Sequence, residues 1–287
     1  MPDAPCGAHN AGTMNLAGVV DLHVHSAPDL RPRSIDDLGV ARQALEHGLV
    51  GVLLKNHYVP TAGRAALARA HVPGAPVFGG VALNDSVGRL NPRAVEVAAH
   101  FGGRAVWLPT VSAAGQRRAE GYDDGISLLR PDGALHPGLR AVFEVVAAHD
   151  LLLCTGHAGA AEVMAIVPAA LAAGVRRVLV QHCEHHLVNL SLDQQRELAG
   201  QGAYLERVFS QPTRDGGYRR NLDVNVVAIR AVGVSSTVLA SDLGQVENPP
   251  WIEGLAAYLD GVESAGFSAG EMDIMSRKNP ATLLGTI

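Results

Sequence analysis

Short apolar runs alternate with longer alanine-rich stretches along most of the chain, and this alternation constrains the fold more than any other feature. Most of the runs are unbroken rather than alternating, as expected for parallel strands that are buried on both faces. The expected strands are Gly18–Val24, Gly51–Lys55, Pro76–Leu83, Arg104–Pro109, Leu151–Thr155, Arg177–Gln181, Ala203–Val208 and Ser236–Ala240.

A helical stretch follows each expected strand. The first begins at Ser34 as N-cap and ends at Gly48; the others are Thr61–His71, Pro92–Phe101, Gly138–His149, Ala160–Ala173, Ser191–Gly200, Asn221–Ala231 and Trp251–Ala265. One strand followed by one helix, eight times in 287 residues, predicts an α/β fold of the (β/α)8 TIM-barrel type in a single domain. A doubly wound sheet is the competing architecture, and the count of eight disfavours it.

Two segments lie outside this repeat. Residues 1–16 precede the first strand and are expected to form a flexible arm. The connection from Pro109 to Gly138 is longer than the others and contains an Asp132-Gly133 turn that would close a small hairpin. We expect this fourth strand-to-helix loop to be a lid or a specificity insertion.

Composition narrows the function classes. Hydrophobic residues make up 47% of the chain, and the formal net charge is −5, so there is no basic stripe for nucleic acid. No apolar stretch is long enough to span a membrane, and Met1–Gly18 does not read as a secretory signal. The odd cysteine count, with no CxxC spacing, indicates a reducing cytoplasm. We therefore expect a cytoplasmic protein with a small-molecule partner, and a homo-oligomer is possible.

Ionisable residues gather where the expected strands end. In a barrel of this kind the active site is built at the carboxyl ends of the strands. The residues at or just past these ends are His23, His25, Lys55, His57, His157, His182, His185, His186 and Asp242.

The two histidines of the first strand are spaced i, i+2, so that both imidazoles point to the same side. Alone, His23 and His25 fit a polar barrel mouth as well as a metal site. With His157, His182 and Asp242 they predict a site for a Zn²⁺-like ion, because nitrogen and carboxylate ligands suit such ions. Core packing of the histidines and capping by Asp242 are the alternatives. Asp242 would also take a proton from a metal-activated water.

These residues resemble the motifs of the amidohydrolase superfamily of metal-dependent hydrolases. The matching elements are His23-Val-His25, His157, His182, Asp242 and a tail, Lys278-Asn-Pro-Ala-Thr-Leu-Leu-Gly, which looks like the helix that often closes those barrels. The resemblance implies that His23, His25 and Asp242 hold a first metal and that His157 and His182 hold a second. It further implies that Asp242 is the general base, with one or two zinc ions, or manganese or iron(II) instead.

The chain departs from that superfamily at the fourth strand. Binuclear members usually bridge their metals there with a carboxylated lysine or a glutamate, and Arg104-Ala-Val-Trp107-Leu-Pro-Thr offers neither. Lys55 would substitute as a carboxylated bridge and metal ligand, or act catalytically as an ammonium that binds substrate charge. Otherwise His23, His25, His157 and Asp242 would surround one ion, as in decarboxylase-like relatives.

A second resemblance is to the PHP phosphoesterases, which use three metals. It rests on Asp21-Leu-His-Val-His-Ser26 and on Lys55-Asn-His57. The histidine that normally follows the final aspartate by two residues is absent after Asp242, and strand three ends at Asn84 without a glutamate. A PHP-type phosphoesterase is therefore the runner-up to an amidohydrolase.

Further residues are candidates for contacts with the substrate. Arg31 and Arg33 follow the histidine pair, and arginine forks suit anionic groups. Glu206 and Arg207 end the seventh strand and would orient substrate or pair with each other. His57, His185 and His186 are candidates for additional ligands or for donors to the ligands. The sequence thus predicts a metal-dependent hydrolase that cleaves an amide, cyclic amide or ester bond of a small anionic substrate, and a non-catalytic binding barrel is the remaining alternative.

Overall fold

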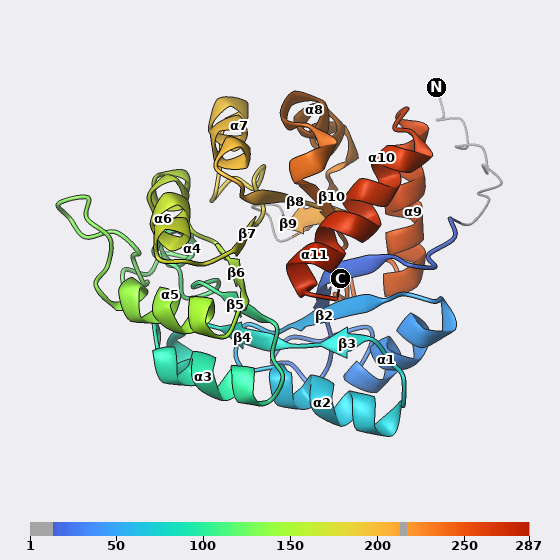
Figure 1. The fold of residues 1–287 in the computed structure, drawn as a ribbon, viewed down its shortest axis with the longest axis horizontal. Coiled ribbons are helices and arrows are strands. Elements are labelled where there is room, and N and C mark those ends of the chain that lie inside the picture. The colour runs from blue at the N-terminus through green and yellow to red at the C-terminus, as the bar shows by residue number, and fades with distance from the viewer. Residues whose placement is uncertain (1–13, 213–216, 287) are drawn as a thin grey trace.

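Parallel strands form the centre of the molecule and helices surround them (Figure 1). The structure is a computed structural model, which describes residues 14–212 and 217–286. The parallel strands are β1 (Val20–His25), β2 (Gly51–Lys55), β3 (Val77–Phe78), β4 (Gly80–Ala82), β5 (Ala105–Trp107), β6 (Leu152–Cys154), β7 (Arg177–Val180), β8 (Tyr204–Val208) and β11 (Thr237–Ala240). They pair in two sheets, β1-β2-β3 and β11-β8-β7-β6-β5-β4.

The two sheets continue one another at both junctions. At the first junction, β3 and β4 are two halves of the expected third strand, interrupted at Gly79. A Cβ atom there would lie 2.3 Å from the backbone of Thr61, so only glycine permits this close approach. At the second, His25 N donates to Leu243 O at 2.8 Å and Asp242 N donates to His23 O at 2.9 Å. The expected α/β barrel order is confirmed, although regular pairing does not run unbroken around the ring.

The helices that follow the strands agree with the predicted pattern. They are α1 (Asp37–Glu46), α2 (Ala62–His71), α3 (Pro92–His100), α5 (Gly138–Ala148), α6 (Ala160–Ala172), α7 (Leu192–Gly200), α8 (Leu222–Val232) and α9 (Trp251–Ser264). The first helix differs at its start, because the N-cap is Asp36 and not Ser34. The Asp36 side chain accepts a hydrogen bond from Gly39 N, as a capping carboxylate does.

The C-terminal segment closes one end of the barrel. It consists of α10 (Ala269–Asp273), a π-helical turn (Ile274–Lys278) and α11 (Asn279–Leu284). Leu283 and Leu284 are fully buried in a cluster with Val20 of β1, Leu53 of β2 and Leu179 of β7. The α11 helix therefore plugs the amino-terminal end, opposite the end where the strands reach their last residues.

Of the remaining elements, one was expected from the sequence and the others were not. The long loop after β5 contains the helix α4 (Ala114–Ala119) and, as expected, a small hairpin that is closed by a bridge between Leu129 and Leu135. A second hairpin, β9 (Ser210–Pro212) with β10 (Tyr218–Arg220), follows β8. Short 3₁₀ turns occur at Asp85–Val87 and Val234–Ser236, and the latter shortens the expected eighth strand.

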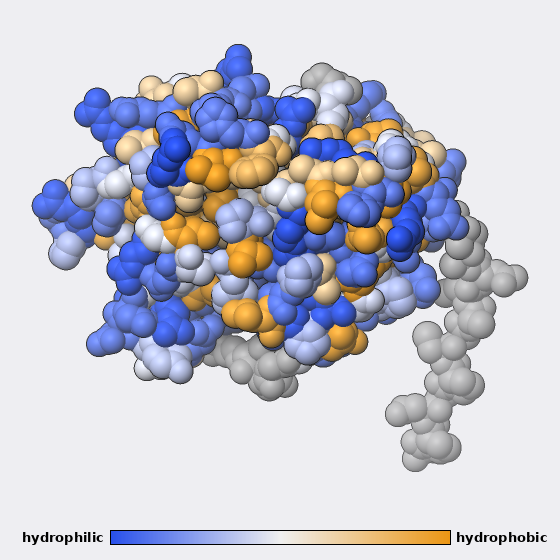
Figure 2. Space-filling view, turned by 90° about the horizontal axis from the view of Figure 1, so that it is seen from below, coloured by the Kyte–Doolittle hydropathy of each residue, from blue (hydrophilic) through white to orange (hydrophobic). Residues whose placement is uncertain are grey.

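The surface and the N-terminal segment complete the fold. Figure 2 shows apolar patches interspersed with hydrophilic residues over one face. Of the expected N-terminal arm, residues 1–13 lie outside the described residues, whereas Leu16 is buried in the core. Among the described helices, none has the length and apolar character that crossing a membrane requires.

Candidate metal and substrate site

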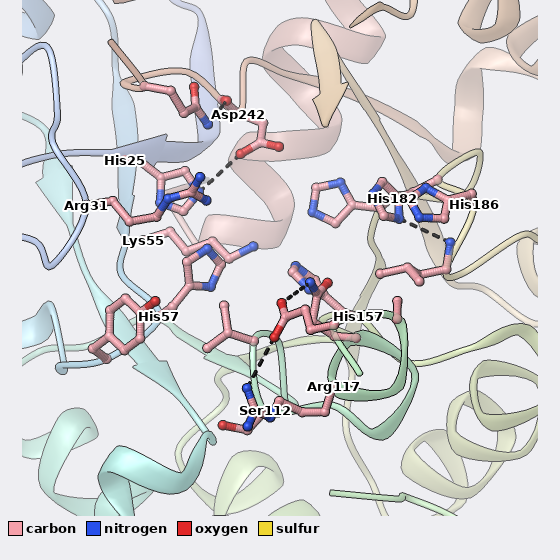
Figure 3. A pocket seen from close by; sticks show the side chains of 18 of the residues that line it. His25, Arg31, Lys55, His57, Ser112, Arg117, His157, His182, His186 and Asp242 are labelled. Atoms are coloured by element: carbon pink, nitrogen blue, oxygen red, sulfur yellow. Dashed lines mark hydrogen bonds and ion pairs between the residues drawn. The ribbon is translucent and has the colours of Figure 1, made fainter. Parts of the chain in front are cut away.

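The side chains of the predicted ligands converge at the carboxyl ends of the strands, and Figure 3 shows four of them, His25, His157, His182 and Asp242. His23 and His25 lie on β1, and His157, His182 and Asp242 follow β6, β7 and β11. A cavity of about 1220 Å³ opens above them, and four of the five line it, while His23 lies beneath. Residues that are far apart along the chain thus meet at one point of the barrel.

Asp242 is at the centre of this group. Its Oδ1 lies 3.0 Å from His23 Nε2 and 3.1 Å from His25 Nε2. Ligand atoms of His23, His182 and Asp242 lie within 4.8 Å of one another. Asp242 and His182 both have left-handed backbone conformations, with φ of 51° and 53°, which are uncommon for residues other than glycine. These sharp turns directly follow the strands, and both side chains reach the cavity.

An irregularity in β1 sets the direction of the two histidines. The register with β2 shifts between Asp21 and Val24. Asp21 reaches outward, where its Oδ2 accepts a hydrogen bond from Trp251 Nε1 of α9 at 2.9 Å. His23, two residues later, faces the interior instead. A bulge that changes the side on which residues point accounts for the difference.

Burial and charge act against each other at the site. Burial would raise the pKa of Asp242, but the neighbouring His23, His25 and His182 hold it well below its usual range, so the carboxylate is ionised. Burial would lower the pKa of His23, but Asp242 and Glu206 outweigh burial and Lys55 and raise it to about 9. His25 lacks this second carboxylate, and burial lowers its pKa to about 3.

His23 is held from below by buried polar groups. Its Nδ1 lies 3.0 Å from Glu206 Oε1, which also accepts a hydrogen bond from Gln181 Nε2 at 3.0 Å. Its Nε2 lies 3.0 Å from Lys55 Nζ. Because the pKa of His23 is raised to about 9, its Nδ1 carries a proton that is donated to Glu206 Oε1, and Nε2 faces Asp242. Paired histidine and carboxylate groups of this kind orient metal ligands in proteins.

The donor set fits a divalent cation. Two imidazole Nε2 atoms point at one carboxylate oxygen, with a third imidazole close by, and all of these side chains are buried. Without a cation, such contacts require protons on the histidines. Neutral imidazoles and a carboxylate are ligands that suit zinc and related ions. The site therefore fits such an ion because the lone pairs of these nitrogen and oxygen atoms point toward one another.

A site with two ions requires a bridging residue, and the two places to look for it are Lys55 and the end of β5. Lys55 is 1% exposed, and burial lowers the pKa of its ammonium, although Asp242 and Glu206 oppose this shift. Past β5, the strand at which the sequence offered no bridging lysine or glutamate, Thr110 is buried, and its Oγ1 lies 2.8 Å from His57 Nδ1. The structure therefore places Lys55 next to His23, where a carboxylated lysine would have to lie to bridge two ions.

The rim of the cavity contains the predicted arginines. Arg31 is exposed there, whereas Arg33 forms a buried ion pair with Asp29 at 2.7 Å. His185 and His186 line the same cavity, and their rings lie 4.4 Å apart between centroids. Arg117 of α4 also lines it, so the long loop after β5 forms part of the cavity wall.

Glu206 and Arg207 do not line the cavity, and the pairing between them that the sequence left open is not found. Glu206 is fully buried beneath His23, and its Oε2 has no partner among the described residues. Arg207 is also fully buried, and it pairs with Glu184. These two side chains support the barrel interior, and any contact with a substrate would have to pass through His23 and the β7 loop.

Several residues of the site were missed by sequence reasoning. Gln181 contacts Glu206, Asn84 contacts Thr110, and Tyr218 of the β9–β10 hairpin lines the cavity. Gln181, Asn84 and Thr110 all lie at or just past strand ends, which was the available signal. Their uncharged side chains made them less conspicuous than the histidines. No pattern in the sequence indicated Tyr218.

The sequence and the fold were compared with those of known proteins. A family described as a family of unknown function (DUF6282) matches residues 18–206. No curated protein is similar enough in sequence to match this chain.

Solved structures of several hydrolases share the fold. An amidohydrolase from Pseudomonas aeruginosa superposes with a TM-score of 0.64 at 11% identity, covering 93% of this chain and 95% of that one. The metallopeptidase dipeptidase AC gives 0.59 at 12% identity, covering 93% and 98%. An organophosphorus hydrolase mutant from Deinococcus radiodurans gives 0.55 at 16% identity, covering 99% and 100%. The chain therefore shares its fold with these hydrolases.

Proposed function

Because this chain belongs to the DUF6282 family of unknown function and has an amidohydrolase fold, we propose that it is a metal-dependent hydrolase. Its reaction would be hydrolysis of an amide, cyclic amide or ester bond in a small anionic substrate. The single observation that carries the proposal is the convergence of two Nε2 atoms on Asp242 Oδ1 at the floor of a large cavity.

The residues divide into ligands and proton carriers. His23, His25 and Asp242 would hold a first ion, and His157 with His182 would hold a second. When bound, a zinc-like ion supplies Lewis acidity at this point, which acidifies a nearby water and polarises a carbonyl oxygen. Asp242 Oδ1 faces the two histidines, so Oδ2 is the atom that takes the proton of the attacking water and passes it to the leaving group.

The charge of the cavity supports an anionic substrate. Arg31 stands at the rim, and no carboxylate partner is found for it among the described residues, in contrast to Arg33 and Arg117. A guanidinium without a partner binds carboxylate or phosphate groups strongly. The rim therefore holds the anionic end of the substrate, and the scissile bond lies near Asp242.

Elemental analysis and a substrate panel test this proposal. We expect one or two ions per chain in the purified protein, and hydrolysis of at least one lactam, N-acyl amino acid or lactone. Asp242→Asn should lower this activity by about 10²–10⁴-fold, the range for a lost general base. Asp193→Asn, the same change at an exposed acid of α7, is the control and should leave activity unchanged.

Three results would contradict the proposal. A protein that binds no metal under any loading condition is not a metal-dependent hydrolase. Full activity of the Asp242→Asn variant would show that Asp242 is not the general base. Three ions per chain with phosphomonoester cleavage would identify a phosphoesterase instead. Native mass spectrometry separates the roles of Lys55: a mass gain of one CO₂ shows the carboxylated lysine that a bridging ligand requires, and an unmodified mass agrees with a free side-chain amino group.

A further inference from the structure

The orientation of the Asn84 amide is fixed by the backbone around it. Its Oδ1 accepts hydrogen bonds from Thr110 N at 2.8 Å and from Ser112 N at 3.1 Å. The other end of the amide, Nδ2, must therefore be the donor. It donates to His57 O and to Thr110 Oγ1, both at 2.7 Å. Asn84 is 1% exposed, so water does not offer an alternative arrangement.

The Thr110 hydroxyl is fixed in turn. It is fully buried, and its oxygen accepts the Asn84 Nδ2–H group. A buried hydroxyl also has to donate its own hydrogen, since an unsatisfied donor costs about 1–3 kcal/mol. Within the described part of the chain, the acceptor in reach is His57 Nδ1 at 2.8 Å. The hydroxyl hydrogen therefore points at Nδ1.

The ring proton of His57 follows from this. Because Nδ1 accepts a hydrogen bond, it carries no proton, and the proton of the neutral ring lies on Nε2. His57 lines the cavity, with ring centroids 5.0 Å from His25 and 5.7 Å from His157. Its Nε2 is not among the buried nitrogens that lack a partner, in contrast to Nδ1 of His25 and of His157. The Nε2–H group is thus open to the cavity, at whose wall the His57 ring lies in Figure 3.

We propose that His57 is not a metal ligand but a hydrogen-bond donor, whose Nε2–H binds a carbonyl or carboxylate oxygen of the substrate. A ligand nitrogen needs a free lone pair, and the lone pair of His57 is engaged by Thr110. Asn84 and Thr110 are positioning residues that keep the ring in this form. Only the identity of the acceptor rests on the proposed function, since the position of the proton follows from the hydrogen bonds alone.

This assignment separates the two resemblances seen in the sequence. The likeness to PHP phosphoesterases at strand two depends on His57 being a ligand, and a donor role removes that support. The donor role also gives the site a fixed hydrogen-bond donor beside the proposed ligands. His57 Nε2–H would stabilise a substrate oxygen that gains negative charge during the reaction.

Nitrogen NMR of the protein labelled with ¹⁵N-histidine tests the position of the proton, with the His57 signals assigned from their loss in His57→Gln. We expect Nδ1 to be unprotonated and Nε2 protonated in the wild type and in Thr110→Ser. Thr110→Val keeps the side-chain shape but removes the hydroxyl, and should abolish this preference. A proton on Nδ1 in the wild type, or direct coupling of a His57 nitrogen to bound ¹¹³Cd²⁺, would overturn the proposal.

Titration with acetate and acetamide tests the acceptor without a known substrate. The Nε2–H resonance should shift on addition of either probe in the wild type, and the absence of any shift contradicts the donor role. For the best substrate of the panel, His57→Gln should lower turnover about 10²–10³-fold at unchanged metal content. Loss of ions in His57→Gln overturns the assignment. A wild type without metal or turnover defeats the proposed hydrolase, while the NMR result still decides the proton position.

Discussion

At the scale of single residues, His23 shows how the barrel interior prepares a metal ligand. Glu206 below it and Asp242 beside it are both carboxylates, and the ring lies 3.0 Å from each. Glu206 keeps a proton on Nδ1, so that only Nε2 is left to bind a cation. The sequence predicted that Glu206 would either orient substrate or form an ion pair with Arg207, because residue order cannot show that its side chain lies beneath His23.

Replacing Glu206 tests this support. Glu206→Gln removes the charge but keeps the size, so we expect the cation affinity to fall by about 10–100-fold, the usual effect of losing such a partner. Competition with a chromogenic chelator measures this. Glu197→Gln, at an exposed site on α7, is the matched control. Equal affinity in the two variants would show that Glu206 does not orient His23.

The pH dependence of metal uptake follows from the raised pKa of His23, near 9. Below that pH the cation-free ring carries a proton on each nitrogen, and a cation must displace the one on Nε2. Protons therefore compete with the cation, and affinity should rise about tenfold per pH unit until it levels off near pH 9. Calorimetry in buffers of different ionisation enthalpy counts the released proton. A pH-independent affinity would contradict this account.

At the scale of elements, the meeting of β1 and β11 depends on side chains as much as on backbone. Asp21 accepts hydrogen bonds from Ser241 N at 3.0 Å and from Trp251 Nε1 at 2.9 Å, which ties β1, β11 and α9 together. Gly244 is also required there, because it has φ of 118° and a Cβ atom would fall 1.8 Å from His25 O. This junction positions three of the proposed ligands.

The two buried tryptophans offer a matched test of that junction. Trp251→Phe removes the donor to Asp21 Oδ2, although Oδ1 keeps its bond from Ser241 N. This change should lower the free energy of unfolding by about 1–3 kcal/mol more than Trp107→Phe. Trp107 is equally buried, but its Nε1 has no partner among the described residues. Chemical denaturation compares the variants. Equal losses would show that the hydrogen bond to Asp21 contributes nothing.

Sequence patterns predicted the repeating elements well and the irregular ones poorly. Unbroken apolar runs marked the strands, and all eight predicted helices are present, with ends within a few residues of those expected. The helix α4 and the β9–β10 hairpin were missed, because short elements that cover a cavity lack a regular apolar face. A similar limit applies to the site. Histidines at strand ends are conspicuous in a sequence, whereas the roles of Asn84 and Thr110 depend on hydrogen bonds that form only in the folded chain.

At the scale of the whole molecule, α11 holds the far end of the barrel. Leu284 is fully buried, and its Cδ2 lies so close to Gly51 that a Cβ atom there would be 2.6 Å away. Leu284→Ala should therefore cost about 2–5 kcal/mol of stability. Leu67→Ala, at a side chain of α2 that is 60% exposed, is the control. Thermal denaturation decides it, and similar melting of both variants would mean that α11 is dispensable.

The interrupted pairing between β1 and β11 has a consequence for the loaded protein. His23 and His25 lie on the β1 side of this interruption, and Asp242 lies on the β11 side. An ion bound by all three residues would therefore link the two strands where their regular pairing is interrupted. A chelator should then weaken this junction of the barrel as well as abolish hydrolysis. After removal of the ion, backbone amide hydrogens of β1 and β11 at this junction should exchange with solvent faster than those elsewhere in the barrel. The ion would then stabilise the fold in addition to taking part in the reaction.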